Sequence, residues 1–117
     1  MAAIEPENFS WVEPGFLAGM ALPKEPAHLQ YLVNHGIKHL VSIEPTWKMS
    51  FLKDFPQLIS HPIVVVDFEA PTRAQINEFL SIVKSAKAKN EPVGVHCDAG
   101  SGRTGTFLAC YLAVTRK

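Results

Sequence analysis

Hydrophobic residues recur along this chain at two spacings, one typical of helices and the other of strands. Residues 26–34 carry apolar side chains at helical spacing, and Gly36 is placed to end that helix. Residues 72–75 read as a capping box that begins a second helix, which continues to about Asn90. Its apolar stripe consists of Ile76, Phe79, Leu80, Val83 and Ala86. The pattern therefore predicts helices over 26–34 and 72–90, and a last helix over 103–116.

The apolar runs between these helices predict strands. Residues 9–19 place a Pro-Gly turn pair between two apolar segments, which indicates a short hairpin or two edge strands. The runs 38–44, 62–68 and 91–96 predict three more strands, and 62–68 is continuous enough to be buried on both faces. Residues 45–61 are bounded by proline and predict a long loop or a short helix. This order predicts an α/β sandwich around a central, mostly parallel sheet flanked by helices.

Composition and charge restrict the class of protein. With 117 residues, 47% of them hydrophobic, the sequence predicts a single globular domain over 1–117. Eleven basic residues balance eleven acidic ones, so the overall charge predicts no affinity for nucleic acid or for an anionic membrane. No run of about 18 apolar residues occurs, and the first residues do not resemble a signal peptide. With only two cysteines, we expect a reduced protein in the cytosol or the nucleus.

The most informative segment is His96–Thr104, which reads HCDAGSGRT and lies between a predicted strand and a predicted helix. A helix N-terminus offers unpaired N–H groups, and glycines let a loop turn its amides inward around an anion. An arginine adds a planar set of donors that suits a tetrahedral oxyanion. The segment therefore predicts a phosphate site. Its expected ligands are Asp98, Ala99, Gly100, Ser101, Gly102 and Arg103.

Cys97 lies at the start of this loop. Most intracellular cysteines are small buried hydrophobic residues, but a cysteine beside a helix N-terminus and an arginine has a lowered pKa and is a nucleophile. The Cys-x5-Arg spacing, with glycines between, favours the nucleophile. We expect Thr104 to donate a hydrogen bond to the thiolate, and His96 to orient the loop rather than transfer protons.

A nucleophilic attack on phosphorus is assisted by a general acid that protonates the leaving oxygen. Asp67 ends the predicted strand 62–68, so it emerges at the same sheet edge as Cys97. Glu69 follows two residues later, and physical reasoning from the sequence does not rank one above the other. A polar strand end or helix cap is the structural alternative for Asp67.

Several other residues receive weaker predictions. Trp47 and Lys48 follow a strand end and either flank the pocket or belong to an ordinary surface loop. Cys110 lies about 10 Å along the last helix from the loop, too far for a disulfide with Cys97, so core packing is expected for it. Four further histidines lie without metal-ligand spacing, so no metal or other cofactor is expected. These are His28, His35, His39 and His61.

The loop HCDAGSGRT resembles the HCxxGxxR-Ser/Thr loop of cysteine-based protein phosphatases. Within that group, the segments NFSWVEPGFLAGMALPKEPAHLQYL, VGVHC and GRTGTFLACYL are similar to the atypical dual-specificity phosphatases, from about Asn8 to Tyr111. The resemblance implies Cys97 as nucleophile, Arg103 and the loop amides as phosphate ligands, and Asp67 as general acid. It implies phosphotyrosine and phosphoserine or phosphothreonine in proteins as substrates, without a metal.

The chain departs from this family in two places. Asp98 follows the nucleophile where related lipid phosphatases have lysine, which opposes highly anionic phosphoinositides. The family continues past the last helix, whereas this chain ends at Lys117, and the apolar run FLACYLAV then predicts a helix that lacks cover. We expect marginal stability, or a dimer that covers its stripe. The stripe consists of Phe107, Leu108, Tyr111, Leu112 and Val114.

Two other functions compete with the phosphatase. A shortened domain can retain the loop and bind phosphate or phosphoproteins with weak catalysis. Sulfurtransferases also use a short cysteine loop, although persulfide transfer needs no acid such as Asp67 for an alkoxide leaving group.

Overall fold

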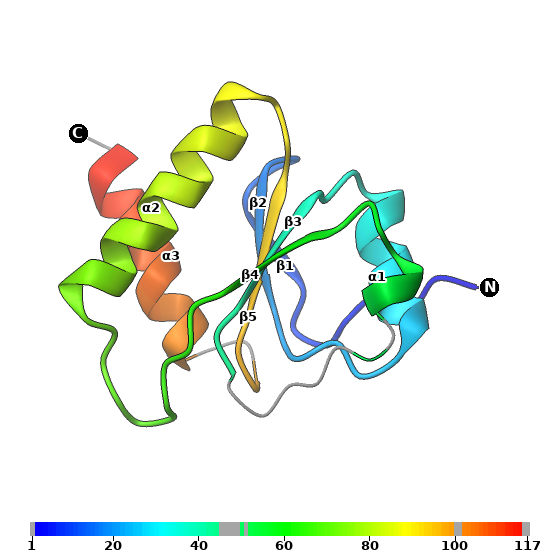
Figure 1. The fold of residues 1–117 in the computed structure, drawn as a ribbon, viewed down its shortest axis with the longest axis horizontal. Coiled ribbons are helices and arrows are strands. Elements are labelled where there is room, and N and C mark those ends of the chain that lie inside the picture. Colours follow the sequence, from blue (N-terminus) through cyan, green and yellow to red (C-terminus); the bar gives the residue numbers. More distant parts are fainter. Residues whose placement is uncertain (1, 45–49, 51, 100–101, 116–117) are drawn as a thin grey trace.

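The computed structural model describes residues 2–44, 50, 52–99 and 102–115 of the chain. A five-stranded sheet separates two helical layers, with α1 (Pro26–Asn34) on one face and α2 (Arg73–Ala88) and α3 (Gly102–Thr115) on the other (Figure 1). This is the predicted α/β architecture. Among the described residues no helix is long and apolar enough to cross a bilayer.

Four of the five strands run parallel, so their carboxyl ends lie at the same end of the sheet. Their order across it is β1-β2-β5-β3-β4, in which β1 runs antiparallel to β2 and the other neighbours are parallel. In parallel sheets, ligands bind beyond the carboxyl ends of the strands. The strands are β1 (Ser10–Glu13), β2 (Leu17–Met20), β3 (His39–Ser42), β4 (Ile59–Pro62) and β5 (Val93–His96).

The helices begin and end close to the predicted positions because their signals are local. At the start of α2, the Thr72 hydroxyl accepts from the Gln75 N–H at 3.1 Å, and the Gln75 side chain accepts from the Thr72 N–H at 2.9 Å. This is the predicted capping box. Gly36, with φ of 81°, follows α1 in a conformation that glycine adopts readily.

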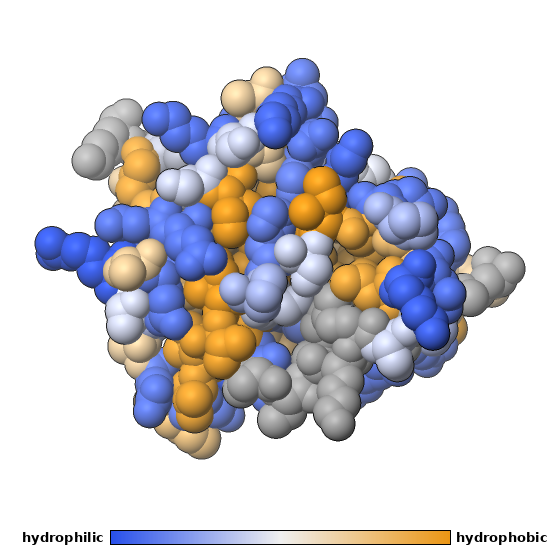
Figure 2. Space-filling view, viewed as in Figure 1, coloured by the Kyte–Doolittle hydropathy of each residue, from blue (hydrophilic) through white to orange (hydrophobic). Residues whose placement is uncertain are grey.

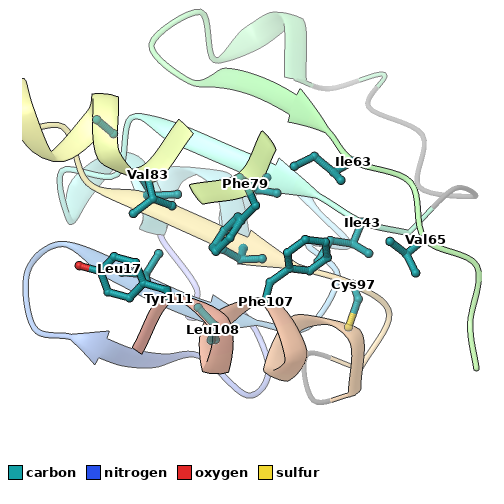
Figure 3. Packing of buried hydrophobic residues seen from close by; sticks show 14 of the residues in the cluster. Leu17, Ile43, Ile63, Val65, Phe79, Val83, Cys97, Phe107, Leu108 and Tyr111 are labelled. Carbon is teal, nitrogen blue, oxygen red and sulfur yellow. The ribbon is translucent and has the colours of Figure 1, made fainter. Parts of the chain in front are cut away.

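The sheet has a hydrophobic cluster on each face. The cluster beneath α1 includes Leu29, Leu32 and Leu40, whereas the larger one lies under α2 and α3. Side chains of the larger cluster, drawn in Figure 3, come from both helices and from the strands, and Cys97 belongs to the same cluster. The helix α3 packs closely on β2, where a Cβ on Gly19 would lie 2.8 Å from Leu108 Cδ1.

The predicted strand over 62–68 is wrong in its position and in its burial. The strand β4 ends at Pro62, and beyond it Ile63 and Val65 are buried while Val64 and Val66 are exposed. The alternation arises because successive side chains of an extended segment point to opposite faces, and Ile63 and Val65 point into the larger hydrophobic cluster. Figure 2 shows hydrophobic residues gathered over this part of the surface. Phe68 is also fully exposed there, with φ of 66°.

The predicted loop over 45–61 is partly wrong as well. Its end belongs to β4, and residues Leu52–Asp54 form a single turn of 3-10 helix, η1, in agreement with the predicted alternative of a short helix. Residues 45–49, with the predicted pocket residues Trp47 and Lys48, lie outside the described part.

The apolar face of α3 is better covered than predicted. The sheet and α2 together bury Phe107, Leu108 and Tyr111, so Val114 is the large side chain of the stripe that stays exposed. Cys110 is half-buried and is not a member of either core cluster, so its predicted packing role is wrong. An apolar groove of about 450 Å³ remains between α2 and α3, lined in part by Leu80, Tyr111 and Val114.

Candidate active site

The candidate residues meet in one pocket at the carboxyl edge of the sheet. Cys97 follows β5 directly, and Arg103 is the second residue of α3. Asp67 comes from the segment between β4 and α2. The pocket has a volume of about 230 Å³ and is lined by Asp67, Cys97, Asp98, Ala99, Gly102 and Arg103.

Cys97 is buried at the base of this pocket, at the end of the larger hydrophobic cluster (Figure 3). Its position follows from the sheet, because β5 lies between β2 and β3 and is held on both sides. A thiol in this place is fixed by the core on one side and opens to the pocket on the other. The geometry suits a nucleophile that must meet a bound group at a constant distance.

Arg103 is held by two acceptors from the neighbouring segments. Its Nη1 donates to the Val65 carbonyl at 2.7 Å, and its Nη2 lies 2.8 Å from Glu44 Oε1. The side chains of Arg103 and Glu44 are only 5% and 12% exposed. A buried guanidinium needs such partners, because an unpaired charge is costly to remove from water. Together they fix the direction in which the guanidinium faces the pocket.

Asp67 is close to the arginine but much more open to solvent. Its Oδ1 lies 3.7 Å from Arg103 Nε, and its side chain is 60% exposed. The same oxygen accepts from the Phe68 N–H at 3.0 Å, which restrains the carboxylate. Glu69, the alternative acid, is exposed and is not among the residues that line the pocket. The geometry therefore favours Asp67 over Glu69.

His96 is buried beneath the loop and connects it to β3. Burial lowers the pKa of His96 to about 4, so the ring is neutral at pH 7. Its Nδ1 lies 3.1 Å from the Cys97 carbonyl, which can only accept, so Nδ1 carries the proton and donates. Its Nε2 then accepts from the Ser42 hydroxyl at 2.9 Å. This geometry suits the predicted role of orienting the loop.

Thr104 is buried in the first turn of α3, and its hydroxyl has no hydrogen-bond partner within the described ranges. A buried hydroxyl of this kind needs an explanation, and donation to a thiolate, as the sequence predicts, is one. Asp98, Ala99 and Gly102 are exposed at the pocket. The predicted ligands Gly100 and Ser101 lie outside the described residues.

Sequence reasoning missed two residues that contact the predicted site. Glu44 pairs with Arg103, and Ser42 donates to His96. Both belong to the predicted strand 38–44, and polar residues at its carboxyl end were the available signal. Sequence reasoning also treated His39 and His61 as scattered, but His39 Nδ1 lies 2.9 Å from His61 Nε2 on the adjacent strand, and His39 Nε2 lies 2.8 Å from Glu91 Oε1.

A cysteine after a strand, an arginine in the first turn of the next helix and a carboxylate at the same pocket are the arrangement expected of a phosphatase domain. Residues 6–116 match the model of PTP-SAK, described as "Swiss Army Knife protein, DSP-PTPase phosphatase domain", and the chain belongs to this family.

Individual proteins agree with this assignment. The human dual specificity protein phosphatase CDC14C is 33% identical over 87 residues, which cover 73% of this chain and 18% of that protein. Human CDC14A is 28% identical over 124 residues, covering 93% of this chain and 20% of that protein. The chain thus spans about a fifth of the length of these relatives.

Solved structures show the same fold. The core catalytic domain of the PP-IP phosphatase SIW14 from S. cerevisiae, in complex with citrate, superposes with a TM-score of 0.81 at 21% identity. The match covers 99% of this chain and 71% of that one. PTPMT1 in complex with PI(5)P superposes with a TM-score of 0.76 at 19% identity, covering 88% and 71% of the two chains.

Proposed function

We propose that this protein hydrolyses phosphate monoesters on tyrosine and on serine or threonine of proteins, through a phosphocysteine intermediate. The observation that carries the proposal is the single pocket in which Cys97, Arg103 and Asp67 meet, each supplied by a different segment. The names of the CDC14 relatives support the choice of both kinds of phosphorylated residue.

In the first step the Cys97 thiolate attacks phosphorus while Arg103 and the loop amides bind the non-bridging oxygens. The bond from phosphorus to the ester oxygen breaks, and protonated Asp67 donates its proton to that oxygen. The products are the free alcohol or phenol and a phosphate group bound to the Cys97 sulfur. Arg103 is prepared for this role because Glu44 and the Val65 carbonyl already fix its orientation.

In the second step water replaces the sulfur at phosphorus. The Asp67 carboxylate now accepts a proton from the attacking water, the bond from sulfur to phosphorus breaks, and the thiolate leaves with the electron pair. A hydrogen bond from Thr104, whose buried hydroxyl has no other partner within the described ranges, stabilises the departing thiolate. Inorganic phosphate is released and Asp67 is protonated again, so the chemistry balances without a metal or a redox cofactor.

A phosphate-binding module and a sulfurtransferase are the two alternative functions. Asp67 in the pocket favours the phosphatase over the sulfurtransferase, because only the phosphatase needs a proton for a leaving oxygen. Asp98, exposed at the same pocket, disfavours highly anionic lipid headgroups. We expect phosphorylated proteins as partners, and the cytosol or the nucleus as the location, because the nucleophile must stay reduced. A second copy of the chain would bind at the groove between α2 and α3.

The proposed function is tested by the turnover of para-nitrophenyl phosphate and of phosphopeptides by the purified protein. We expect Cys97→Ser to abolish turnover while inorganic phosphate still binds, because the loop amides and Arg103 remain. The matched control is Cys110→Ser, since the chain has two cysteines and Cys110 lies outside the pocket.

Three outcomes decide between the phosphatase and the binding module. Full activity in Cys110→Ser and none in Cys97→Ser agrees with the phosphocysteine mechanism. A parent protein that binds phosphate without turnover is a binding module. Turnover in Cys97→Ser within tenfold of the parent overturns the mechanism.

A further inference from the structure

Four consecutive carbonyl groups at the start of the phosphate loop each accept a hydrogen bond. The His96 carbonyl accepts from the Ile43 N–H at 2.9 Å, and the Cys97 carbonyl accepts from the His96 ring at 3.1 Å. The Asp98 carbonyl accepts from the Leu22 N–H at 2.9 Å. The last one, of Ala99, accepts from the side-chain amide of Asn8 at 2.7 Å.

These bonds matter because a trans peptide unit is planar, so its C=O and its N–H point in opposite directions. Leu22 holds the Asp98 carbonyl, so the Ala99 N–H of the same unit points away from Leu22. Leu22 and Asn8 are not among the residues that line the pocket. The bonds therefore keep carbonyl oxygens, which repel phosphate, directed at groups outside the pocket.

Among the four donors, Asn8 is the only one that is both a side chain and exposed. The donors from Ile43 and Leu22 are backbone N–H groups, and His96 is part of the buried core. A carbonyl can only accept, so the nitrogen of the Asn8 amide faces Ala99. The hydrogen bond joins the N-terminal segment to a loop that lies 91 residues further along the chain.

The backbone around Asn8 is held by contacts of its two neighbours in the chain. Its φ is 57°, a left-handed conformation in which asparagine is more frequent than most residues other than glycine. On one side of it, the Glu7 carbonyl accepts from the Ala21 N–H at 2.8 Å. On the other side, the Phe9 ring meets Trp11 and Tyr31 edge to face, with ring centres 5.4 and 5.3 Å away. These contacts hold the backbone in place on both sides of Asn8.

From this geometry we infer that Asn8 is a positioning residue of the phosphate site, which holds the Ala99 carbonyl away from the bound oxyanion. Without the N–H group of the Asn8 side chain, the Ala99 carbonyl is free to rotate and to turn its oxygen toward the pocket. Loss of this hydrogen bond should weaken the binding of an oxyanion and of the transition state by a similar factor. The inference deepens the proposed function and rests on it.

The test compares two asparagines that share a backbone conformation. Asn90 also has φ of 57°, but it lies between α2 and β5, at the amino-terminal edge of the sheet. Asn8→Gly and Asn90→Gly therefore make the same chemical change without backbone strain. Asn8→Asp is a second variant, which keeps the shape of the side chain and removes the donor.

We expect Asn8→Gly to weaken the binding of tungstate, measured by calorimetry, by about 3- to 10-fold, the value of one hydrogen bond. Asn8→Asp also brings a negative charge to Ala99, so its loss of affinity should be at least as large. The kcat/KM for para-nitrophenyl phosphate falls by a similar factor. Asn90→Gly leaves both quantities unchanged. A structural role alone would change the melting temperature and not the affinity for tungstate.

Two results for the variants would overturn the inference. One is an unchanged affinity for tungstate in both Asn8 variants, and the other is an equal loss in Asn90→Gly. The proposed function fails independently, if the parent binds tungstate but does not hydrolyse para-nitrophenyl phosphate. In that case the tungstate comparison still decides the role of Asn8. A parent that binds no tungstate overturns both.

Discussion

Two carboxylates approach Arg103 from neighbouring strand ends, and they differ in almost every other respect. Glu44 follows β3, lies 2.8 Å from Nη2 and is 12% exposed. Asp67 follows β4 at the sheet edge, lies 3.7 Å from Nε and is 60% exposed. The buried partner thus follows β3, which has neighbours on both sides in the sheet, and the open one follows the edge strand β4.

The difference shows how one site separates two tasks between similar groups. A buried carboxylate in contact with a guanidinium stays ionised and holds its partner in place. An open carboxylate that lines the pocket is free to contact the leaving group of a bound substrate. We therefore assign positioning to Glu44 and proton transfer to Asp67, and the two assignments predict different kinetic losses.

The largest effect is expected for Asp67→Asn, which removes the proton donor. For alkyl phosphates, whose leaving groups need a proton, kcat should fall by about 10²–10⁴-fold. For para-nitrophenyl phosphate the loss should be much smaller, because its leaving group departs as an anion. Steady-state kinetics with both substrates provide the measurement. Glu69→Gln is the control, and equal losses on the two substrates would refute the assignment of the acid to Asp67.

Glu44→Ala should have the next largest effect, and it should not depend on the leaving group. Loss of a hydrogen bond to a charged group corresponds to a decrease of about 10- to 100-fold in kcat/KM. Glu44→Gln keeps the size and an acceptor oxygen, so it should recover part of the activity. The melting temperature of each variant is measured alongside, because Arg103 is left buried with a weaker partner.

The comparison breaks if Glu44→Ala slows alkyl phosphates far more than para-nitrophenyl phosphate. That result would give Glu44 the proton-transfer role. Equal losses on both substrates, with partial recovery in Glu44→Gln, would agree with a positioning role.

Which of these features can be predicted from sequence depends on how local their causes are. The capping box at Thr72 and the turn at Gly36 each depend on a few adjacent residues, and the predicted positions of α2 and α1 are close to the observed ones. The prediction of a strand over 62–68 was wrong because the β-branched residues of this segment show only a propensity for extended backbone. The pairing and the exposure of the segment depend on its place at the edge of the sheet.

The same distinction applies to the site. Cys97 and Arg103 lie in one continuous loop, so their spacing was visible in the sequence. Glu44 and Asn8 contact that loop from distant segments, and only the order of the strands and the path of the N-terminal segment bring them there. Between Asp67 and Glu69 the sequence left a choice, and the pocket includes only Asp67.

A third carboxylate, Asp98, extends the comparison to an exposed position that forms no ion pair with Arg103 in the described part of the chain. Its side chain lies at the pocket in water, where a unit charge contributes about 0.2–1 kcal/mol. Asp98→Asn should therefore strengthen tungstate binding by no more than about fivefold, because it removes a repulsive charge. The gain should disappear at high ionic strength, which screens exposed charges but not the buried pair at Glu44. Calorimetric titrations at low and high salt test this, with Glu69→Gln as an exposed control outside the pocket. Weaker binding in Asp98→Asn would mean that this side chain assists the oxyanion, and that exposure does not order the three carboxylates as proposed.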